Sequence, residues 1–167
     1  MCHGSELRFE VVTVLATEVL WLSDLTATTL QLMAYWLLKS EPQDYSYANL
    51  EQEGRAVWNG VKNPLALKHL RTMQPGDKAL IYHTGKERQV VGVAEVLTLP
   101  YPDPALNNPK LVVVDIQAVR SLPQPVTLAQ IKQNSNLTDF DLIRLPRLSV
   151  VPVPIEYWSQ ILQLAGE

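Results

Sequence analysis

The spacing of apolar residues divides the chain into two parts. Residues 1–32 are rich in Thr, Val and Leu but follow neither the period of two typical of a strand nor the period of 3.6 typical of a helix. A short apolar run at residues 35–38 then predicts a buried strand that ends before Pro42. We therefore expect one domain over residues 33–167, with residues 1–32 as a leader outside it.

The leader has two interpretations. Met33 directly precedes the first strand pattern, so we expect translation to begin there naturally. The other interpretation is a helix from Glu18 to Leu32 that packs on the domain. The segment has no basic region at its start, and its longest charge-free apolar run, residues 11–17, is too short to span a membrane. We expect no membrane anchor, and a cytoplasmic or nucleoid-associated protein that is not secreted.

The pattern after residue 42 predicts short helices mixed with strands. A first helix is expected after Asp44 or Ser46, and further helices at residues 64–73, 128–133 and 154–164. Strands are expected at residues 78–83, 90–97, 111–119 and 149–152, with a turn-containing connector at 57–62 and no clear pattern at 142–148. About five strands with Gly and Pro at the corners predict an α+β fold, a small β-barrel or curved sheet flanked by short helices.

The charge of the chain excludes one class of protein. The net charge is −3, and residues 1–32 account for all of it with four acidic residues and one basic residue. The expected domain is therefore neutral and lacks the excess of Lys and Arg that gives strong non-specific binding to duplex nucleic acid. The single cysteine is Cys2, which excludes disulfides and cysteine-ligated metal from residues 33–167. We expect no metal and no cofactor.

Aromatic and amide side chains gather at two places in the pattern. Trp58 and Asn59 lie in the expected connector, where a large ring has no periodic role in a core. Tyr82, His83 and Thr84 end an expected strand. Rings beside hydrogen-bonding groups suit a flat heterocycle, which stacks on the ring and is bonded at its edge. A purely structural use of these residues is an equal alternative.

A charged tripeptide, Lys39, Ser40 and Glu41, ends the first expected strand. A lysine there could act as a general base and a glutamate could carry a proton, provided that both side chains face one cavity. Solvated charges at a strand end are the simpler interpretation.

Six motifs together resemble those of EVE domains, as in the thymocyte nuclear protein family. They are YWLLKSEP at residues 35–42, WNGVKN at 58–63, MQPGD at 73–77, YHT at 82–84, VGVA at 91–94 and LSV at 148–150. The resemblance runs in order from residue 34 to residue 164 and omits residues 1–32. It implies a PUA-like fold, related to YTH and ASCH domains, that reads a modified base of DNA or RNA held flipped in an aromatic pocket.

The resemblance also implies roles for individual residues. The residues expected to form the base pocket are Lys39, Ser40, Trp58, Asn59, Tyr82, His83 and Thr84, and those expected at its rim or on phosphate are Lys62 and Asn63. Three positions depart from the common family pattern: Lys62 where arginine is frequent, Thr84 where serine is frequent, and Leu111 where tryptophan is common. If that tryptophan closes the pocket, Leu111 leaves one wall aliphatic.

The sequence supports a non-catalytic reader of a cytosine- or adenine-derived base, whose partner is nucleic acid and which acts as a monomer. An enzyme is the alternative, because some ASCH-type relatives hydrolyse acylated cytidine with a lysine, a hydroxyl residue and a glutamate. Lys39, Ser40 and Glu41 superficially resemble these three catalytic residues, and Glu95 is another possible acid. A module that binds only protein is a third. A panel of modified nucleosides, including N4-acetylcytidine, discriminates among the three.

Overall fold

A computed structural model describes residues 33–167. Both interpretations of residues 1–32 lie outside the described residues. The strands are β1 (Tyr35–Ser40), β2 (Arg55–Trp58), β3 (Lys78–His83), β4 (Gln89–Val96), β5 (Tyr101–Pro102), β6 (Val112–Thr127) and β7 (Val150–Pro152). The helices are α2 (Tyr47–Glu53), α3 (Pro64–Leu70), α4 (Leu128–Gln133), α5 (Asp141–Arg144) and α6 (Ile155–Leu164), with a short 3-10 turn at Ser135–Leu137.

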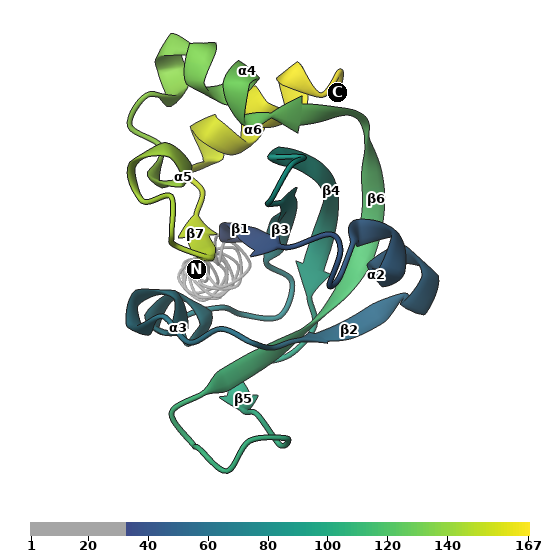
Figure 1. Cartoon of the computed structure of the whole chain (residues 1–167), viewed down its shortest axis with the longest axis vertical. Coiled ribbons are helices and arrows are strands. Elements are labelled where there is room, and N and C mark those ends of the chain that lie inside the picture. The colour runs from purple at the N-terminus through teal and green to yellow at the C-terminus, as the bar shows by residue number, and fades with distance from the viewer. Residues whose placement is uncertain (1–32) are drawn as a thin grey trace, which may run out of the picture. The chain divides into compact units, whose positions relative to one another are not determined.

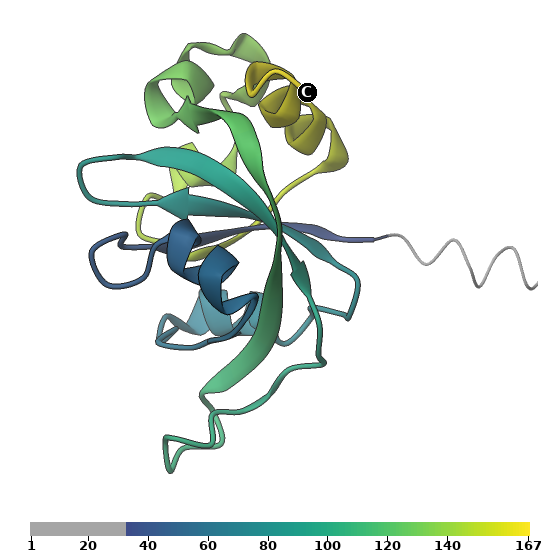
Figure 2. The ribbon, with the colours of Figure 1, turned by 90° about the vertical axis from the view of Figure 1, so that its right-hand side faces the viewer.

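The strands form one mixed, strongly curved sheet. Their order is β2-β6-β4-β3-β1-β7, and β5 pairs with β6. β1 runs parallel to β3, while the other neighbouring strands are antiparallel. The long strand β6 bends along the height of the domain and carries β2 on its lower half (Figures 1 and 2). The result is a half-barrel with helices beside it, which confirms the predicted α+β fold.

Apolar residues on both faces of the central strands make the core. Leu37 and Leu38 of β1 and Leu80 and Ile81 of β3 are all buried, although neighbours along a strand point to opposite faces. Such strands lack alternation because both of their faces are covered. Helices α4, α5 and α6 gather at one end of the domain, away from α3 (Figure 1).

Helix α2 is fixed to the sheet at a glycine. Ser46 caps its N-terminus, and Tyr47 in its first turn is buried with its hydroxyl donating to Val93 O at 2.7 Å. A Cβ on Gly92 would overlap the Tyr47 ring. The Tyr47 ring thus occupies the space that a side chain at position 92 would need, and this contact holds α2 against β4.

Two predictions need correction. Residues 55–58 form a strand, so residues 57 and 58 of the predicted connector at 57–62 belong to β2. The pattern is hard to recognise because β2 has four residues at a sheet edge. β6 extends to Thr127, beyond the predicted end of this strand at residue 119, although it contains Pro123 and Pro125. The prolines are tolerated because residues 122–125 lie in a bulge, where the register with β4 shifts and no ladder partner is required.

Candidate functional site

A cavity lies between the end of β1, the loop before α2, and the segment that begins with β2. Its volume is about 580 Å³, within the range of roughly 300–1,000 Å³ typical of small-molecule sites. Its lining comes from separate segments: Lys39, Ser40, Glu41, Asp44, Tyr45, Ala56, Val57, Trp58, Asn59, Gly60, Val61 and Ser149. We call it the base cavity. Four residues of the predicted pocket, Lys39, Ser40, Trp58 and Asn59, are therefore among those that line it.

Ser40 contributes a hydroxyl group without a partner. Its Oγ is the one buried side-chain oxygen or nitrogen within residues 33–167 that makes no hydrogen bond. A buried hydroxyl in this condition costs about 1–3 kcal/mol of folding free energy. Its cost is offset if a ligand supplies the missing bond, and rotation about Cα–Cβ lets the hydroxyl choose among staggered positions.

Trp58 ends β2 opposite Val114 of β6. Only 7% of its surface is exposed, and it belongs to the hydrophobic core. The expectation that this ring has no core role is therefore wrong: Trp58 is a wall of the cavity and part of the core at once. Asn59 and Gly60 follow it in the loop between β2 and α3, where Gly60 has a φ of 77°, a conformation that favours glycine.

A second ring, Tyr45, lines the base cavity and was not among the predicted site residues. It lies half-buried before α2, and its hydroxyl donates to Glu53 Oε2 at 2.9 Å. Burial, and then the Glu53 carboxylate, raise the pKa of Tyr45 to about 12, so the ring is neutral at physiological pH. The signal used for Trp58, a ring in a loop near polar residues, would also have found Tyr45.

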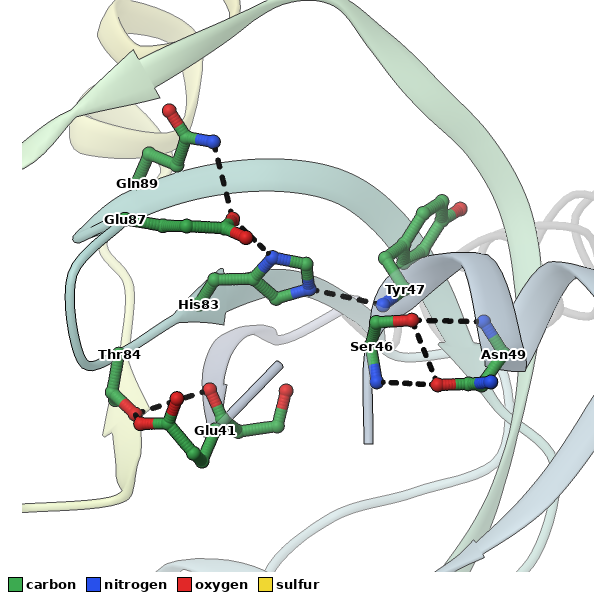
Figure 3. Close-up of polar contacts among 9 residues, drawn as sticks. Glu41, Ser46, Tyr47, Asn49, His83, Thr84, Glu87 and Gln89 are labelled. Atoms are coloured by element: carbon green, nitrogen blue, oxygen red, sulfur yellow. Dashed lines mark hydrogen bonds and ion pairs between the residues drawn. The ribbon is translucent and has the colours of Figure 1, made fainter. Parts of the chain in front are cut away.

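Carboxylates, rather than cations, are the charged groups on this side of β1. Glu41 and Asp44 both line the cavity. Glu41 Oε2 accepts a hydrogen bond from Thr84 Oγ1 at 3.0 Å, which leaves Glu41 fixed at the cavity edge (Figure 3). The nearby main chain is also fixed, because Asp44 N and Tyr45 N both donate to Glu41 O.

Lys39 points its ammonium group to the opposite side of β1 from Ser40, as alternation along a strand requires. Its Nζ donates to Pro146 O at 2.9 Å and lies 5.9 Å from the centre of the Tyr82 ring. Desolvation by burial lowers the pKa of Lys39 to about 8. Pro146 and Tyr82 line a second cavity, of about 300 Å³, which Lys39 shares with the base cavity.

Three predicted pocket residues therefore lie elsewhere. Tyr82 and Thr84 line the second cavity, and His83 lines neither cavity. Both nitrogens of the His83 ring are engaged: Nε2 accepts from Tyr47 N at 2.9 Å, and Nδ1 faces Glu87 Oε2 at 2.6 Å and donates to it (Figure 3). His83 thereby satisfies one of the free N–H groups at the start of α2.

The remaining predicted residues lie outside the base cavity as well. Asn63 caps α3, accepting from Leu65 N and Ala66 N, and Lys62 precedes it as an exposed residue. Leu111 packs on the core and does not line the cavity, so the expected aliphatic wall is not there. Glu95 forms an ion pair with Lys78.

Within the described part of the chain, no helix is long and apolar enough to cross a membrane, and no three acidic, His or Cys side chains gather as a metal site would need.

The motifs and the cavity can be compared with known proteins. The model of the EVE domain family matches residues 34–164. This chain belongs to the EVE domain family. The match covers every element of the described domain and both cavities.

Two proteins with related sequences have solved structures. Rpa0253 from Rhodopseudomonas palustris is 40% identical, with a TM-score of 0.77 over 80% of this chain and 94% of its own. Human thymocyte nuclear protein 1 is 28% identical over 80% of this chain and 74% of its own. Its structure in complex with DNA containing 5-methylcytosine matches with a TM-score of 0.74, over 80% of this chain and 98% of that one. This EVE domain therefore has the PUA-like fold predicted from the motifs.

An ASCH domain from Zymomonas mobilis is a more distant neighbour, 11% identical with a TM-score of 0.52. That likeness shows a shared fold alone.

Proposed function

We propose that this EVE domain reads a modified nucleobase of DNA or RNA, held extruded in the base cavity, without catalysing a reaction. The observation that carries the proposal is the cavity itself: it joins Ser40, Trp58 and Asn59, which the sequence separates, and adds the ring of Tyr45. Two rings can stack on a heterocycle, while the Ser40 hydroxyl and the backbone at residues 59–60 offer hydrogen bonds to its edge.

The charges of the cavity favour a base with an exocyclic amino group. Glu41 and Asp44 are acceptors, and carboxylates accept readily from the N4 amino group of cytosine. A carbonyl at the same position, as in uracil or thymine, would meet lone pairs. The relative solved with 5-methylcytosine DNA points in the same direction. We therefore propose a cytosine-derived base, with 5-methylcytosine as the first candidate.

The geometry argues against the hydrolase alternative. Lys39 and Ser40 are successive residues of β1 and face opposite sides, with the Lys39 ammonium held by Pro146 O. Glu41 is hydrogen-bonded to Thr84 rather than to either of them. A base, a nucleophile and an acid must lie within hydrogen-bond reach of one another or of one substrate atom, and these three do not converge.

Binding of free nucleosides tests the proposal. We expect the chain to bind 5-methyl-2′-deoxycytidine more tightly than 2′-deoxycytidine or thymidine in calorimetric titrations. Replacing Tyr45 with alanine should weaken binding by about five- to 150-fold, the effect of losing about 1–3 kcal/mol of stacking. Tyr45→Phe is the matched control, since it keeps the ring and loses only the hydroxyl that contacts Glu53.

Other outcomes would favour the rivals. Failure to bind any nucleoside of a modified panel would reject a base reader and favour a protein-interaction module. Acetate released from N4-acetylcytidine by the wild type, and not by Lys39→Ala, would favour the hydrolase. We further propose that the protein is a cytoplasmic or nucleoid-associated monomer, which sedimentation and fractionation would test.

A further inference from the structure

The second cavity has a composition opposite to that of the base cavity. Its lining includes three cationic side chains, Lys39, Arg88 and Lys132, and the Glu41 carboxylate lies against two further lining residues, Thr84 and Gly85. The other lining residues are Tyr82, Thr84, Gly85, Leu128, Leu142 and Pro146. In a domain with no net charge, this concentration of one sign is local.

The cations come from three elements that converge here. Lys39 is on β1, Arg88 is in the turn between β3 and β4, and Lys132 is in the last turn of α4. The turn is held in place: Arg88 Nε donates to Gly85 O at 3.1 Å, and Leu128 N donates to Arg88 O at 2.8 Å. Arg88 has a φ of 48°, unusual for a residue with a side chain, so the turn keeps it there despite backbone strain.

The cavity is unsuited to a base and suited to an anion. Lys39 Nζ uses one N–H on Pro146 O, which leaves donors free, and the guanidinium of Arg88 keeps its terminal NH2 groups. The cavity is about half the volume of the base cavity, and its aromatic member, Tyr82, is 4% exposed. Charge-assisted bonds from Lys and Arg are the usual means of holding a phosphate.

The two cavities meet at the end of β1, where Lys39 lines both. The Asp44 carboxylate would repel a phosphate from the base cavity, whereas the Glu41 carboxylate is bonded to Thr84 at the border between the two cavities. The charge pattern therefore directs the backbone of a bound strand toward the cationic side.

We propose that the second cavity binds a backbone phosphate of the nucleic-acid strand whose modified base occupies the base cavity; this rests on the proposed function. Arg88 and Lys132 hold the phosphate from the outer side, and Lys39 holds it from the strand end. The domain would thereby recognise a nucleotide within a strand, using a single local contact in place of an extended basic surface.

The test compares a strand with a free nucleoside, using the full chain. Fluorescence anisotropy measures binding of a short single-stranded DNA that contains one 5-methylcytosine, and calorimetry measures binding of 5-methyl-2′-deoxycytidine, which has no phosphate. The variant is Arg88→Gln with Lys132→Gln. The matched control is Lys68→Gln with Lys110→Gln, which removes the same charge from two exposed residues outside both cavities.

We expect the variant to bind the strand at least roughly tenfold more weakly. The slope of the logarithm of the binding constant against the logarithm of salt concentration should become shallower by about 0.7, the change expected for one lost phosphate contact. It should bind the nucleoside as the wild type does, and the control should match the wild type in both assays. Because nucleoside binding reports an intact fold, unfolding of the variant would be recognised.

Three results would overturn the phosphate site. The variant could bind the strand with the affinity and salt slope of the wild type, or the control could lose as much strand affinity as the variant. A folded variant could also lose nucleoside affinity as much as strand affinity. The first leaves the proposed function intact if the wild type binds the nucleoside. Conversely, if neither protein binds any nucleoside but only the variant loses the strand, the phosphate site stands and the proposed base reading is wrong.

Discussion

Replacing Ser40 with alanine should change stability and binding in opposite directions. Ser40 lines the base cavity, and its buried hydroxyl has no hydrogen-bond partner within residues 33–167. In the unfolded chain this hydroxyl is bonded to water, so folding loses that bond without replacing it. Alanine removes the penalty, and it also removes the group proposed to bond the base.

The size of each effect follows from the burial. An unsatisfied buried hydroxyl costs about 1–3 kcal/mol of folding free energy. Removing the oxygen atom also removes its van der Waals contacts, which reduces the gain by about a few tenths of a kcal/mol. We therefore expect Ser40→Ala to raise the free energy of unfolding by about 1 kcal/mol. With a urea m-value of about 2 kcal/mol/M, the midpoint of unfolding should rise by roughly 0.5 M. Loss of one neutral hydrogen bond should weaken nucleoside binding about fivefold.

Urea unfolding followed by tryptophan fluorescence, with calorimetry for the nucleoside, measures both quantities. Ser149→Ala is the matched control, because Ser149 lines the same cavity but its hydroxyl is not a buried group without a partner. The control should leave the midpoint nearly unchanged. A Ser40→Ala protein that is destabilised by 1 kcal/mol or more, or that binds the nucleoside as the wild type does, would refute the reasoning.

Three further predictions follow from the same contacts. Gly92→Ala should lower the free energy of unfolding by about 1–3 kcal/mol in urea titrations, because the added methyl group displaces the buried Tyr47 ring; an unchanged midpoint would show that α2 moves freely. Trp58→Ala should cost about 3–5 kcal/mol of stability because the ring is in the core; a loss under 1 kcal/mol would restore the view that the ring only lines a cavity. Affinity for the 5-methylcytosine strand should fall from pH 7 to pH 9 as Lys39 loses its proton through a pKa of about 8, and nucleoside affinity should not; a flat strand profile would remove Lys39 from the phosphate site. The charged or titratable residues that share the two cavities with Lys39 are Glu41, Asp44, Tyr45, Tyr82, Arg88 and Lys132, and the pKa of Tyr82 is itself raised by burial.

Much of the fold could be predicted because local signals agree with the sheet. The apolar run at residues 35–38, the cap and proline that open α3, and the paired patterns of β3 and β4 all have direct structural causes. β2 and the far half of β6 could not be predicted in the same way. Each depends on a partner strand distant in sequence, and the β6 prolines are acceptable only because of a bulge.

The sequence could select some residues of the site but not the contacts that they make across the fold. Ser40 and Trp58 could be selected because a strand end and an aromatic–amide pair are local features, and the motif resemblance joined them. The division between Lys39 and Ser40 follows from strand alternation, yet their adjacency in the chain suggested one shared pocket. His83 looked like a binding group, but its two hydrogen bonds form across the fold and could not be seen in sequence.

The most direct test of base reading is a nuclear magnetic resonance titration of the isotopically labelled chain with 5-methyl-2′-deoxycytidine. The account predicts saturable shifts of the Ser40, Asn59 and Gly60 amides and of the Trp58 indole N–H, reached at lower concentration than with 2′-deoxycytidine. Shifts confined to residues outside the base cavity, or no shift with any modified nucleoside, would contradict it.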